Sequence, residues 1–312
     1  MLVFAWFYLP FVGGAELFLR AIAERLRDRF DFVIVTTRLR RSLPAVESRP
    51  GLTIVRVGLG TAADKFLYLL AAPLRALRLG PFALVHAVMV SGGAFAAAAY
   101  LKMRRRPSLL TLQDGDSEEY VRRYLGPLFA AYAPLHRRFD RVHAISSYLA
   151  ERAARYGVPP EAVTVVPNGC DPHLLDDAVA PADLAALRRR LGLDGARVVV
   201  SVSRLVLKNG LDRLLQAFPA VTREVPEAAL LLVGDGDDRT ALERMAADLG
   251  IAARVRFAGA VAHAEVPAHL RLGEAFARPS LSEGLGTAFL EAMACGLPVV
   301  GTRTGGIPDF LV

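Results

Sequence analysis

The chain has 312 residues, enough for about two domains, and its 53% of hydrophobic residues excludes a disordered or fibrous protein. Its two cysteines, Cys170 and Cys295, are too few for a disulfide framework or a cysteine-based metal site. The formal charge of +7 is unevenly spread. Residues 1–170 hold 23 Lys and Arg against 13 Asp and Glu, whereas residues 171–312 hold 15 against 18. This split predicts two domains and an anionic partner for the first.

Short apolar runs alternate with turns and helical segments from the beginning of the chain. The first run, LVFAWFY, lacks a basic region in front of it, so we expect a buried strand and no signal peptide. Residues 79–101 carry no Asp, Glu, Lys or Arg, but Pro81 and Gly92-Gly93 favour a strand, a turn and an alanine-rich helix over a membrane span. Further strands are predicted at FDFVIVTT, LTIVRVG, SLLTLQ and RVHAIS.

The second half alternates more regularly, with strands predicted at RVVVSVSR, AALLLVGDG, RVRFAGA, EAFARPS and PVVGT. Continuous apolar strands between helices indicate a parallel sheet covered on both faces. The Pro167-Asn168-Gly169 turn begins the junction. We therefore expect two doubly wound α/β domains, residues 1–175 and 176–312, that face each other across a cleft and bind ligands at the carboxyl ends of their strands.

The most informative segment begins at Pro279 and contains two glutamates, Glu283 and Glu291. A predicted strand leads into a glycine-containing loop, and a helix follows from Thr287. Backbone N–H groups at such a helix start can bind a phosphate, and carboxylates accept hydrogen bonds from sugar hydroxyls. Two glutamates eight residues apart also occur by chance in helical proteins. The glycine loop between the strand and the helix favours a functional site.

A second cluster, Arg204 and Lys208 before Asn209-Gly210, follows the predicted strand RVVVS. Two cations at the carboxyl end of a neighbouring strand could reach the same phosphate and stabilise a developing diphosphate. Read alone, ordinary surface cations are the alternative interpretation.

Other motifs are weak or missing. Gly234-Asp235-Gly236 lacks the third glycine of a dinucleotide fingerprint, which argues against the alternative of an NAD-dependent enzyme or epimerase. The histidines show no metal-ligand spacing, His143 is interpreted as structural, and no G-x-S-x-G or Walker A sequence is present. Nucleic-acid binding is disfavoured because the basic half lacks interleaved aromatic residues or a known module.

Taken together, the motifs resemble those of retaining glycosyltransferases of the group 1 family, which have the GT-B fold. The Glu283 and Glu291 pair matches that family's E-x7-E signature. The other matching segments are Pro10–Glu16, Val166–Asp171, Ser203–Gly210, Leu232–Gly236, Val255–Gly259, Pro279–Pro298 and Thr304–Asp309.

The resemblance implies a role for each matching residue. Arg204 and Lys208 would hold the donor diphosphate, and the backbone of Gly284, Leu285, Gly286 and Thr287 would bind phosphate and sugar. Glu283 would contact sugar hydroxyls and Glu291 the nucleotide ribose. Arg256-Phe257 would meet the base, and Gly13-Gly14 would close on the donor from the first domain. The resemblance implies no metal and no cofactor, and retention by attack on the face that the leaving group occupies.

The chain departs from the family pattern in three places. Asn209 occupies the position of the usual lysine, so Lys208 is expected to replace it. Gln113 stands where a histidine is common; it can bind a sugar but cannot act as a base near neutral pH. The sequence ends at Val312, where family members continue through a further strand and helices. We therefore expect a second sheet of five strands without its outer one, and weak or absent turnover.

The function implied is sugar transfer from a GDP- or UDP-sugar to a glycan or lipid-linked acceptor, with retention of configuration. Gln113, Glu283, Arg204 and Lys208 would be the catalytic residues. The alternative is a nucleotide-sugar-binding module with little turnover. We expect a cytoplasmic protein with no nucleic-acid partner, peripheral on the inner face of the membrane. Basic clusters at Arg38–Arg41, Arg104–Arg106 and His136–Arg141 predict contact with anionic lipid, with a solvated surface as the alternative.

Overall fold

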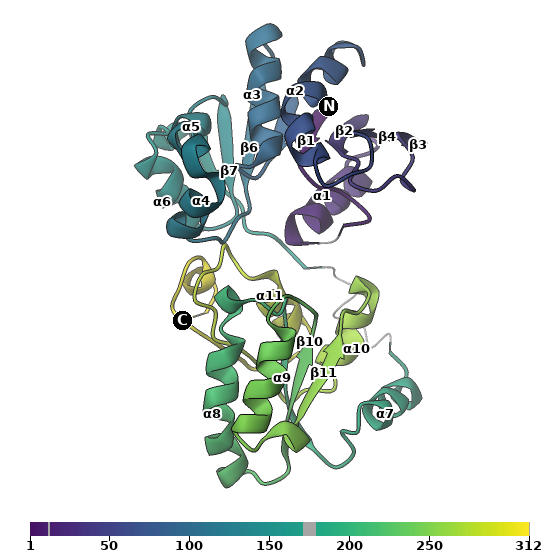
Figure 1. Ribbon diagram of the computed structural model, residues 1–312, viewed down its shortest axis with the longest axis vertical. Helices are drawn as coiled ribbons and strands as arrows, with labels where there is room; N and C mark the ends of the chain where they lie inside the picture. Colours follow the sequence, from purple (N-terminus) through teal and green to yellow (C-terminus); the bar gives the residue numbers. More distant parts are fainter. Residues whose placement is uncertain (12, 171–178, 312) are drawn as a thin grey trace. The chain divides into compact units, whose positions relative to one another are not determined.

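The computed structural model describes residues 1–11, 13–170 and 179–311 (Figure 1). The chain forms two compact units, Met1–Asn168 and Gly169–Val312. The boundary expected between residues 175 and 176 lies outside the described residues. Each unit contains one sheet with helices packed against it, in agreement with the predicted pair of doubly wound domains.

The sheet of the first unit has eight strands within the described residues, in the order β3-β4-β2-β1-β5-β6-β7-β8. Neighbouring strands are parallel except β3 and β4, which pair antiparallel at the edge. The strands are β1 (Leu2–Ala5), β2 (Phe32–Thr37), β3 (Val46–Arg49), β4 (Leu52–Val57), β5 (Val85–Val88), β6 (Ser108–Leu112), β7 (Arg141–Ala144) and β8 (Val163–Val165).

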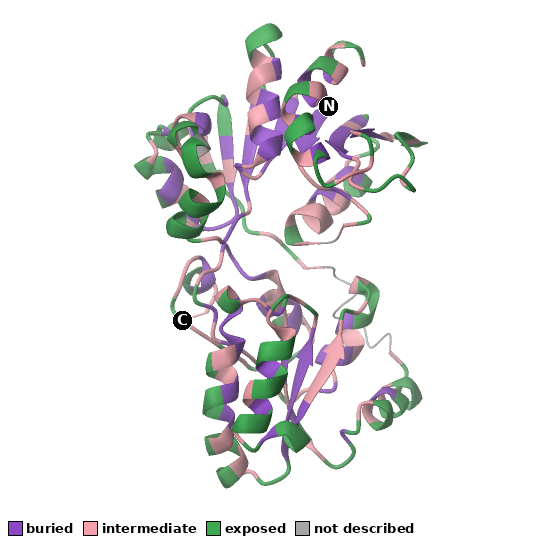
Figure 2. Ribbon diagram, in the orientation of Figure 1, coloured by how far each residue is buried: buried purple, intermediate pink, exposed green. Residues whose placement is uncertain are grey.

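The central strands of this sheet are buried, and exposed residues lie in the loops, on the edge strands and on the outer sides of the helices (Figure 2). Every residue of β1 and β5 is buried, including His86 in the otherwise apolar β5. The helices are α1 (Gly14–Arg25), α2 (Asp64–Leu77), α3 (Gly92–Met103), α4 (Glu118–Leu125), α5 (Phe129–His136) and α6 (Ser147–Arg155).

Residues 79–101 form β5, a turn and α3, which confirms the prediction of a strand, a glycine turn and a helix. Gly93 packs closely on the backbone of Phe4, so a larger residue there would separate α3 from β1. In the described residues, none of the helices combines the length and apolar character needed to cross a bilayer.

The described part of the second unit contains a parallel sheet of five strands in the order β11-β10-β9-β12-β13, as the sequence predicts. The strands are β9 (Arg197–Val202), β10 (Ala228–Val233), β11 (Val255–Gly259), β12 (Ala275–Arg278) and β13 (Val299–Gly301). The helices are α7 (Pro181–Arg190), α8 (Leu211–Glu224), α9 (Arg239–Asp248), α10 (Val266–Leu270) and α11 (Thr287–Ala294).

Apolar cores cover both faces of the second sheet. One includes Leu231, Phe276 and Phe289, and the other Leu215, Phe218 and Leu230. Since Leu230 and Leu231 are consecutive in β10, their side chains point to opposite faces and anchor the two helical layers. This packing leaves the loops after the strands as the sites where polar residues gather.

Candidate functional site

The loop between β12 and α11 carries the first predicted motif. It runs from Pro279 to Gly286, where Gly286 adopts a positive φ of 96° and caps α11. Leu285 is buried and anchors the loop, while α11 begins at Thr287 as predicted. The N–H groups of the first turn of α11 therefore lie at the carboxyl edge of the sheet, where they could bind an anion.

Glu283 is held in this loop by Arg278 at the end of β12. The Arg278 Nη2 atom lies 2.5 Å from Glu283 Oε2, and the Gly284 N–H donates to Oε1 at 3.1 Å. Arg278 is only 5% exposed, its Nε donates to Ser280 Oγ, and its guanidinium lies over the Phe289 ring. Burial lowers the pKa of Arg278, and the nearby carboxylates of Glu283 and Glu291 oppose that shift. Glu283 thus has a fixed orientation.

The Arg204–Gly210 loop packs directly against this glutamate loop. The Lys208 carbonyl accepts a hydrogen bond from the Leu281 N–H at 2.7 Å. Gly210 has a φ of 66°, and a Cβ there would overlap the Pro279 carbonyl oxygen. The contact places Lys208 beside the Glu283 loop, while the side chain of Arg204 is exposed.

The buried Asn209 has a structural role in this loop. Its Nδ2 donates to the Arg204 carbonyl at 2.6 Å and so closes the turn. Asn209 is therefore directed into the loop, and Lys208 is the cation that precedes it in the sequence. That Lys208 replaces the usual lysine stays a prediction.

The loop after β13 supports the glutamate loop from another side. Thr302 Oγ1 donates to the Ser280 carbonyl at 2.5 Å, and the Gly306 N–H donates to the Glu283 carbonyl at 3.2 Å. A Cβ at Gly305 would overlap the Glu283 carbonyl oxygen. The loops after β9, β12 and β13 therefore form one interlocked edge.

Glu291 lies on α11 and is 8% exposed. His263 Nε2 lies 3.0 Å from Glu291 Oε1, a contact that sequence reasoning missed. The two residues are 28 positions apart, so sequence spacing gave no signal for the pair. His263 fixes one carboxylate oxygen of Glu291 and leaves Oε2 for another partner.

Arg256 is not brought to this edge. Its guanidinium donates to the carbonyls of Leu191 and Ala253, which ties β11 to the turn after α7. Phe257 packs against the core between the sheet, α8 and α9. At the carboxyl end of the same strand, the Gly259 carbonyl accepts from the Gly234 N–H at 2.9 Å.

In the first unit, Gln113 follows β6 and pairs with Asn168. Each amide donates to the other, at 3.2 and 3.0 Å. Gly13 and Gly14 begin α1, and a Cβ on Gly13 would collide with the Glu16 carboxylate. The structure places Glu16, but not Gln113, among the residues that line a pocket in this unit.

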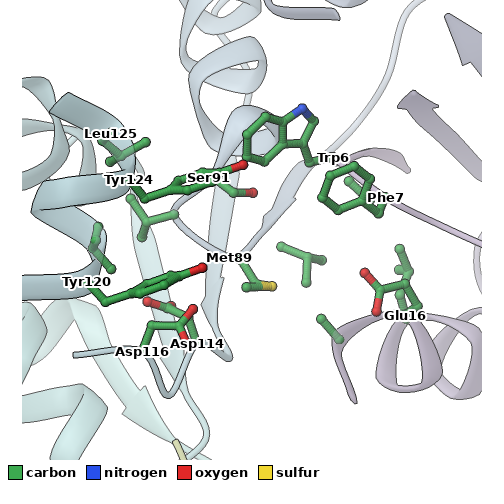
Figure 3. Close-up of a pocket in the computed structure, with 16 residues that line it drawn as sticks. Trp6, Phe7, Glu16, Met89, Ser91, Asp114, Asp116, Tyr120, Tyr124 and Leu125 are labelled. Atoms are coloured by element: carbon green, nitrogen blue, oxygen red, sulfur yellow. The ribbon is translucent and has the colours of Figure 1, made fainter. Parts of the chain in front are cut away.

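That pocket has a volume of about 220 Å³ and lies at the carboxyl ends of β1, β5 and β6 (Figure 3). Sequence reasoning did not identify it. In the close-up, both sides of the pocket carry aromatic and acidic side chains. Its principal lining residues are Trp6, Phe7, Glu16, Met89, Ser91, Asp114, Asp116, Tyr120 and Tyr124.

The pocket contains one buried carboxylate. Asp114 Oδ2 pairs with Arg152 at 2.5 Å and accepts from the Tyr132 hydroxyl at 3.3 Å. Its other oxygen, Oδ1, is buried without a hydrogen-bond partner among the described residues. A buried acceptor without a partner is uncommon in folded proteins. The position of Asp114, just after a central strand, is the sequence signal that could have indicated it.

The polar groups of the described residues form no metal-binding cluster, since no three His, Cys, Asp or Glu side chains group as a metal ion would require.

Two family models match this sequence. "Glycosyltransferase Family 4" matches residues 12–174, and "Glycosyl transferases group 1" matches residues 185–312. The first model alone covers more than half of the chain.

Similar curated proteins match about half of the chain. A GDP-mannose-dependent alpha-(1-6)-phosphatidylinositol monomannoside mannosyltransferase of Mycolicibacterium smegmatis is 41% identical over 180 residues, 55% of this chain and 47% of that protein. One subunit of the human phosphatidylinositol N-acetylglucosaminyltransferase is 38% identical over 157 residues, 50% of this chain and 30% of that protein. The match thus spans less than half of each relative's length.

Among solved structures, Anabaena Alr3699/HepE in complex with UDP-glucose superposes with a TM-score of 0.79 at 25% identity, over 100% of this chain and 82% of that one. WaaG, a glycosyltransferase of lipopolysaccharide biosynthesis, superposes with a TM-score of 0.75 at 19% identity, over 100% of this chain and 83% of that one. The family models and these two folds agree with the motifs quoted above: the chain belongs to the retaining GT-B glycosyltransferases of group 1, family 4.

Proposed function

We propose that the protein transfers a sugar from a GDP- or UDP-sugar to a lipid-linked acceptor, with retention of configuration. The donor would bind the second unit and the acceptor the first. The boundary between the acceptor-side and the donor-side domain would lie close to residue 175. The observation that carries the proposal is the interlocked edge of the second sheet. There, one helix start, Lys208 and the oriented carboxylate of Glu283 occupy the loops after β9 and β12.

Charge and hydrogen-bonding capacity support the assignment of donor contacts. Arg204 and Lys208 would pair with the diphosphate, as would N–H groups from Gly284 to Thr287. Glu283 and Glu291 carry acceptor oxygens only, so they suit the hydroxyls of the sugar and of the ribose. For the base we propose the carboxyl end of β11, at Phe257 and Gly259, because the Arg256 guanidinium is already bonded to Leu191.

In the reaction, an acceptor hydroxyl oxygen forms a bond to the anomeric carbon while the bond from that carbon to the diphosphate oxygen breaks. The acceptor proton passes to the departing diphosphate, so no side-chain base is required. Negative charge grows on the diphosphate as the bond breaks, and Lys208, Arg204 and the α11 N–H groups would stabilise it there. Catalysis then consists of stabilising the leaving group and orienting the two substrates.

The pocket of the first unit suits the polar headgroup of an acceptor. The rings of Trp6, Tyr120 and Tyr124 offer flat apolar faces to a sugar or cyclitol ring. Asp114 also lines the pocket, and its carboxylate would accept a hydrogen bond from one of the headgroup's hydroxyls. The name of the mannosyltransferase includes phosphatidylinositol monomannoside, and that of the human relative includes phosphatidylinositol. We propose an acceptor of this class, met at the cytoplasmic surface of a membrane.

Transfer is tested by incubating the purified chain with GDP-mannose, UDP-glucose or UDP-N-acetylglucosamine and phosphatidylinositol vesicles, and by measuring labelled lipid product. We expect one donor to raise the melting temperature and to give product with the donor's anomeric configuration. Glu283→Gln should lower kcat by about 100-fold, because it removes charge from a contact made at the reacting sugar.

Glu274→Gln is the matched control, because Glu274 lies in an exposed ion pair with Arg197. It should leave kcat unchanged. Donor binding without product would favour the alternative of a nucleotide-sugar-binding module. Absence of binding to every nucleotide sugar would contradict both functions.

A further inference from the structure

We propose that the outer face of α2, together with the loop before it, docks on an anionic phospholipid surface. Helix α2 is apolar on two opposite sides. Its inner side packs on the sheet and α3 through Tyr68, Ala72 and Ala76, which are fully buried.

The outer side of α2 is formed by Phe66, Leu70 and Leu74, which are spaced four residues apart and therefore form one row along the helix. Phe66 is 75% and Leu70 74% exposed, although a solvent-facing helix row is usually polar. A contiguous exposed apolar row of this kind marks an interaction surface.

The loop before α2 extends this row. Leu59 is 70% exposed. The buried carboxylate of Asp64 accepts hydrogen bonds from the N–H groups of Leu59, Gly60 and Thr61, which fixes the loop against the first turn of α2. The apolar surface is therefore held by a rigid base and does not depend on a flexible segment.

Charge identifies the partner of this surface. Residues 38–80 hold eight Lys and Arg but only two Asp and Glu. Both acidic residues are already engaged, Glu47 with Arg49 and Arg56 and Asp64 within its loop. Lys65 and Arg75 lie on α2 itself, beside the apolar row, and Arg78 caps the end of the helix.

The basic Arg38–Arg41 segment adjoins the same loop. Arg40 lies over the Phe11 ring, and the backbone of Arg41 contacts Gly60 so closely that a Cβ on Gly60 would not fit. An apolar row bordered by positive charge matches the interface of an anionic bilayer, into which the apolar side chains insert while Arg and Lys meet the headgroups. A second copy of this chain would bring the same positive charges together, which disfavours it as the partner.

The docking surface is continuous with the pocket of the first unit. The Lys65 ammonium lies 5.7 Å from the centre of the Phe7 ring, and Phe7 lines that pocket. Docking through α2 would thus hold the pocket mouth next to the bilayer, where a lipid-linked headgroup is presented. This last step rests on the proposed function, whereas docking itself does not.

Another sequence-predicted basic cluster is less suited to this role. In the His136–Arg141 segment His136 is fully buried, while Arg137, Arg138 and Arg141 are exposed. The His136 ring packs against Tyr132 and Tyr156 in the core of the first unit.

The test is sedimentation of the full chain with vesicles of phosphatidylcholine alone or mixed with phosphatidylglycerol. We expect binding to the mixed vesicles only, weakened but not abolished by salt. The double variant Phe66→Ser/Leu70→Ser should lower the partition coefficient at least about tenfold. The triple variant Lys65→Gln/Arg75→Gln/Arg78→Gln should bind less at low salt and lose most of its salt dependence.

Met103→Ser/Val221→Ser is the matched control, since both residues are exposed on other helices, α3 and α8. It should bind as the unchanged chain does. Equal binding of the α2 variant, equal binding to neutral vesicles, or a dimer that only the α2 variant disrupts would overturn the proposal. The melting-temperature shift with nucleotide sugar should be the same in all variants. If neither the unchanged chain nor any variant showed this melting-temperature shift, the proposed function would be contradicted instead.

Discussion

Arg278 is the residue that gives Glu283 a defined direction. It reaches the Glu283 carboxylate, the Ser280 hydroxyl and the Val202 carbonyl with different nitrogens of one planar group. Lysine has one nitrogen and cannot make these contacts together. Arg278 is therefore a positioning residue, while Glu283 is the group proposed to touch the sugar.

Arg278→Lys should lower kcat by about 10- to 100-fold while the KM for the donor changes little, because charge is retained and orientation is lost. Steady-state kinetics with varied donor would show this split. Arg188→Lys serves as the control, since Arg188 also binds several carbonyls, those of Leu193, Ala196 and Leu272. Both variants should lose stability, but only Arg278→Lys should lose kcat. An equal loss of kcat in both would reduce Arg278 to a purely structural role.

His263 is expected to act on donor affinity through Glu291. His263→Ala removes the group that fixes Glu291 Oε1, so the KM for the donor should rise roughly three- to tenfold with kcat nearly unchanged. His263→Gln can still donate a hydrogen bond from Nε2 and should restore most of the affinity. Calorimetric titration with the nucleotide diphosphate would measure the affinity of each of the two variants. A donor affinity that is the same in His263→Ala as in the unchanged chain would rule this role out.

Most strands and the loop order of both units could be predicted because their signals are local, but the short edge strands β3 and β8, which lack such an apolar run, were missed. Continuous apolar runs mark buried parallel strands, and β9, β10 and β12 appear where such runs were found. The glutamate loop and the Lys208 loop were predicted as neighbours because parallel strands end at one edge.

Features built from distant segments could not be predicted in this way. The pocket in the first unit combines Trp6, Asp114 and Tyr124, which lie on different elements and become neighbours only through the order of strands in the sheet. The exposure of Phe66 and Leu70 is equally invisible in the sequence, because both faces of α2 are apolar and only packing decides which one is covered. Arg256 shows the opposite situation. Its local motif matches the family pattern, but its side chain bonds to the Leu191 carbonyl and does not reach the edge that carries Glu283.

At the scale of elements, the contact between the Gly210 turn and the Pro279 loop is expected to require glycine for two reasons. Gly210 has a positive φ, and its missing Cβ leaves room for the Pro279 carbonyl. Gly210→Ala should therefore destabilise the second unit by more than the roughly 1 kcal/mol that a positive φ costs an alanine, and should weaken donor binding. Chemical denaturation and nucleotide titration would measure the two effects.

Gly250→Ala separates those two causes. Gly250 has nearly the same φ, 70°, but open space where the Cβ would lie. Gly250→Ala should therefore lose only the free energy of unfolding that a positive φ costs an alanine. Donor binding should stay unchanged in this control. If the two variants were equally stable and bound donor equally well, the close approach of the two loops would have no part in the site.

At the scale of the whole molecule, buried neutral histidines tie the stability of the first unit to pH. His86 Nε2 lies 2.8 Å from Thr111 Oγ1, which also contacts His143, and His143 reaches the Val166 carbonyl. Burial lowers the pKa of His86 to about 4, with a smaller contribution from His143. Burial also lowers the pKa of His136 to about 4, although hydrogen bonds to backbone carbonyls oppose it.

Both histidines ionise near pH 6.5 in the unfolded chain, so between pH 6.5 and 4 the unfolded state binds protons that the folded state does not. Their contribution to stability is complete above pH 6.5 and is lost as the pH falls toward 4. The loss should be roughly 1 kcal/mol per histidine by about pH 5.5 and on the order of 3 kcal/mol below about pH 4. Asp64 also has a shifted pKa, since its N–H bonds outweigh burial and lower it below 3.8, so it acts only at lower pH.

The effect can be followed in the first unit alone, because the single tryptophan of the chain, Trp6, lies there. Urea unfolding monitored by Trp6 fluorescence should show a midpoint that falls steadily from about pH 7.5 to about pH 5. In His86→Gln/His136→Gln the groups that titrate in this window are gone, so the midpoint should be lower at the upper end of the range yet nearly constant across it. A double variant whose midpoint falls as steeply as that of the unchanged chain would place the acid sensitivity in other groups. A flat profile in the unchanged chain would mean that these histidines bind protons equally in the folded and the unfolded state.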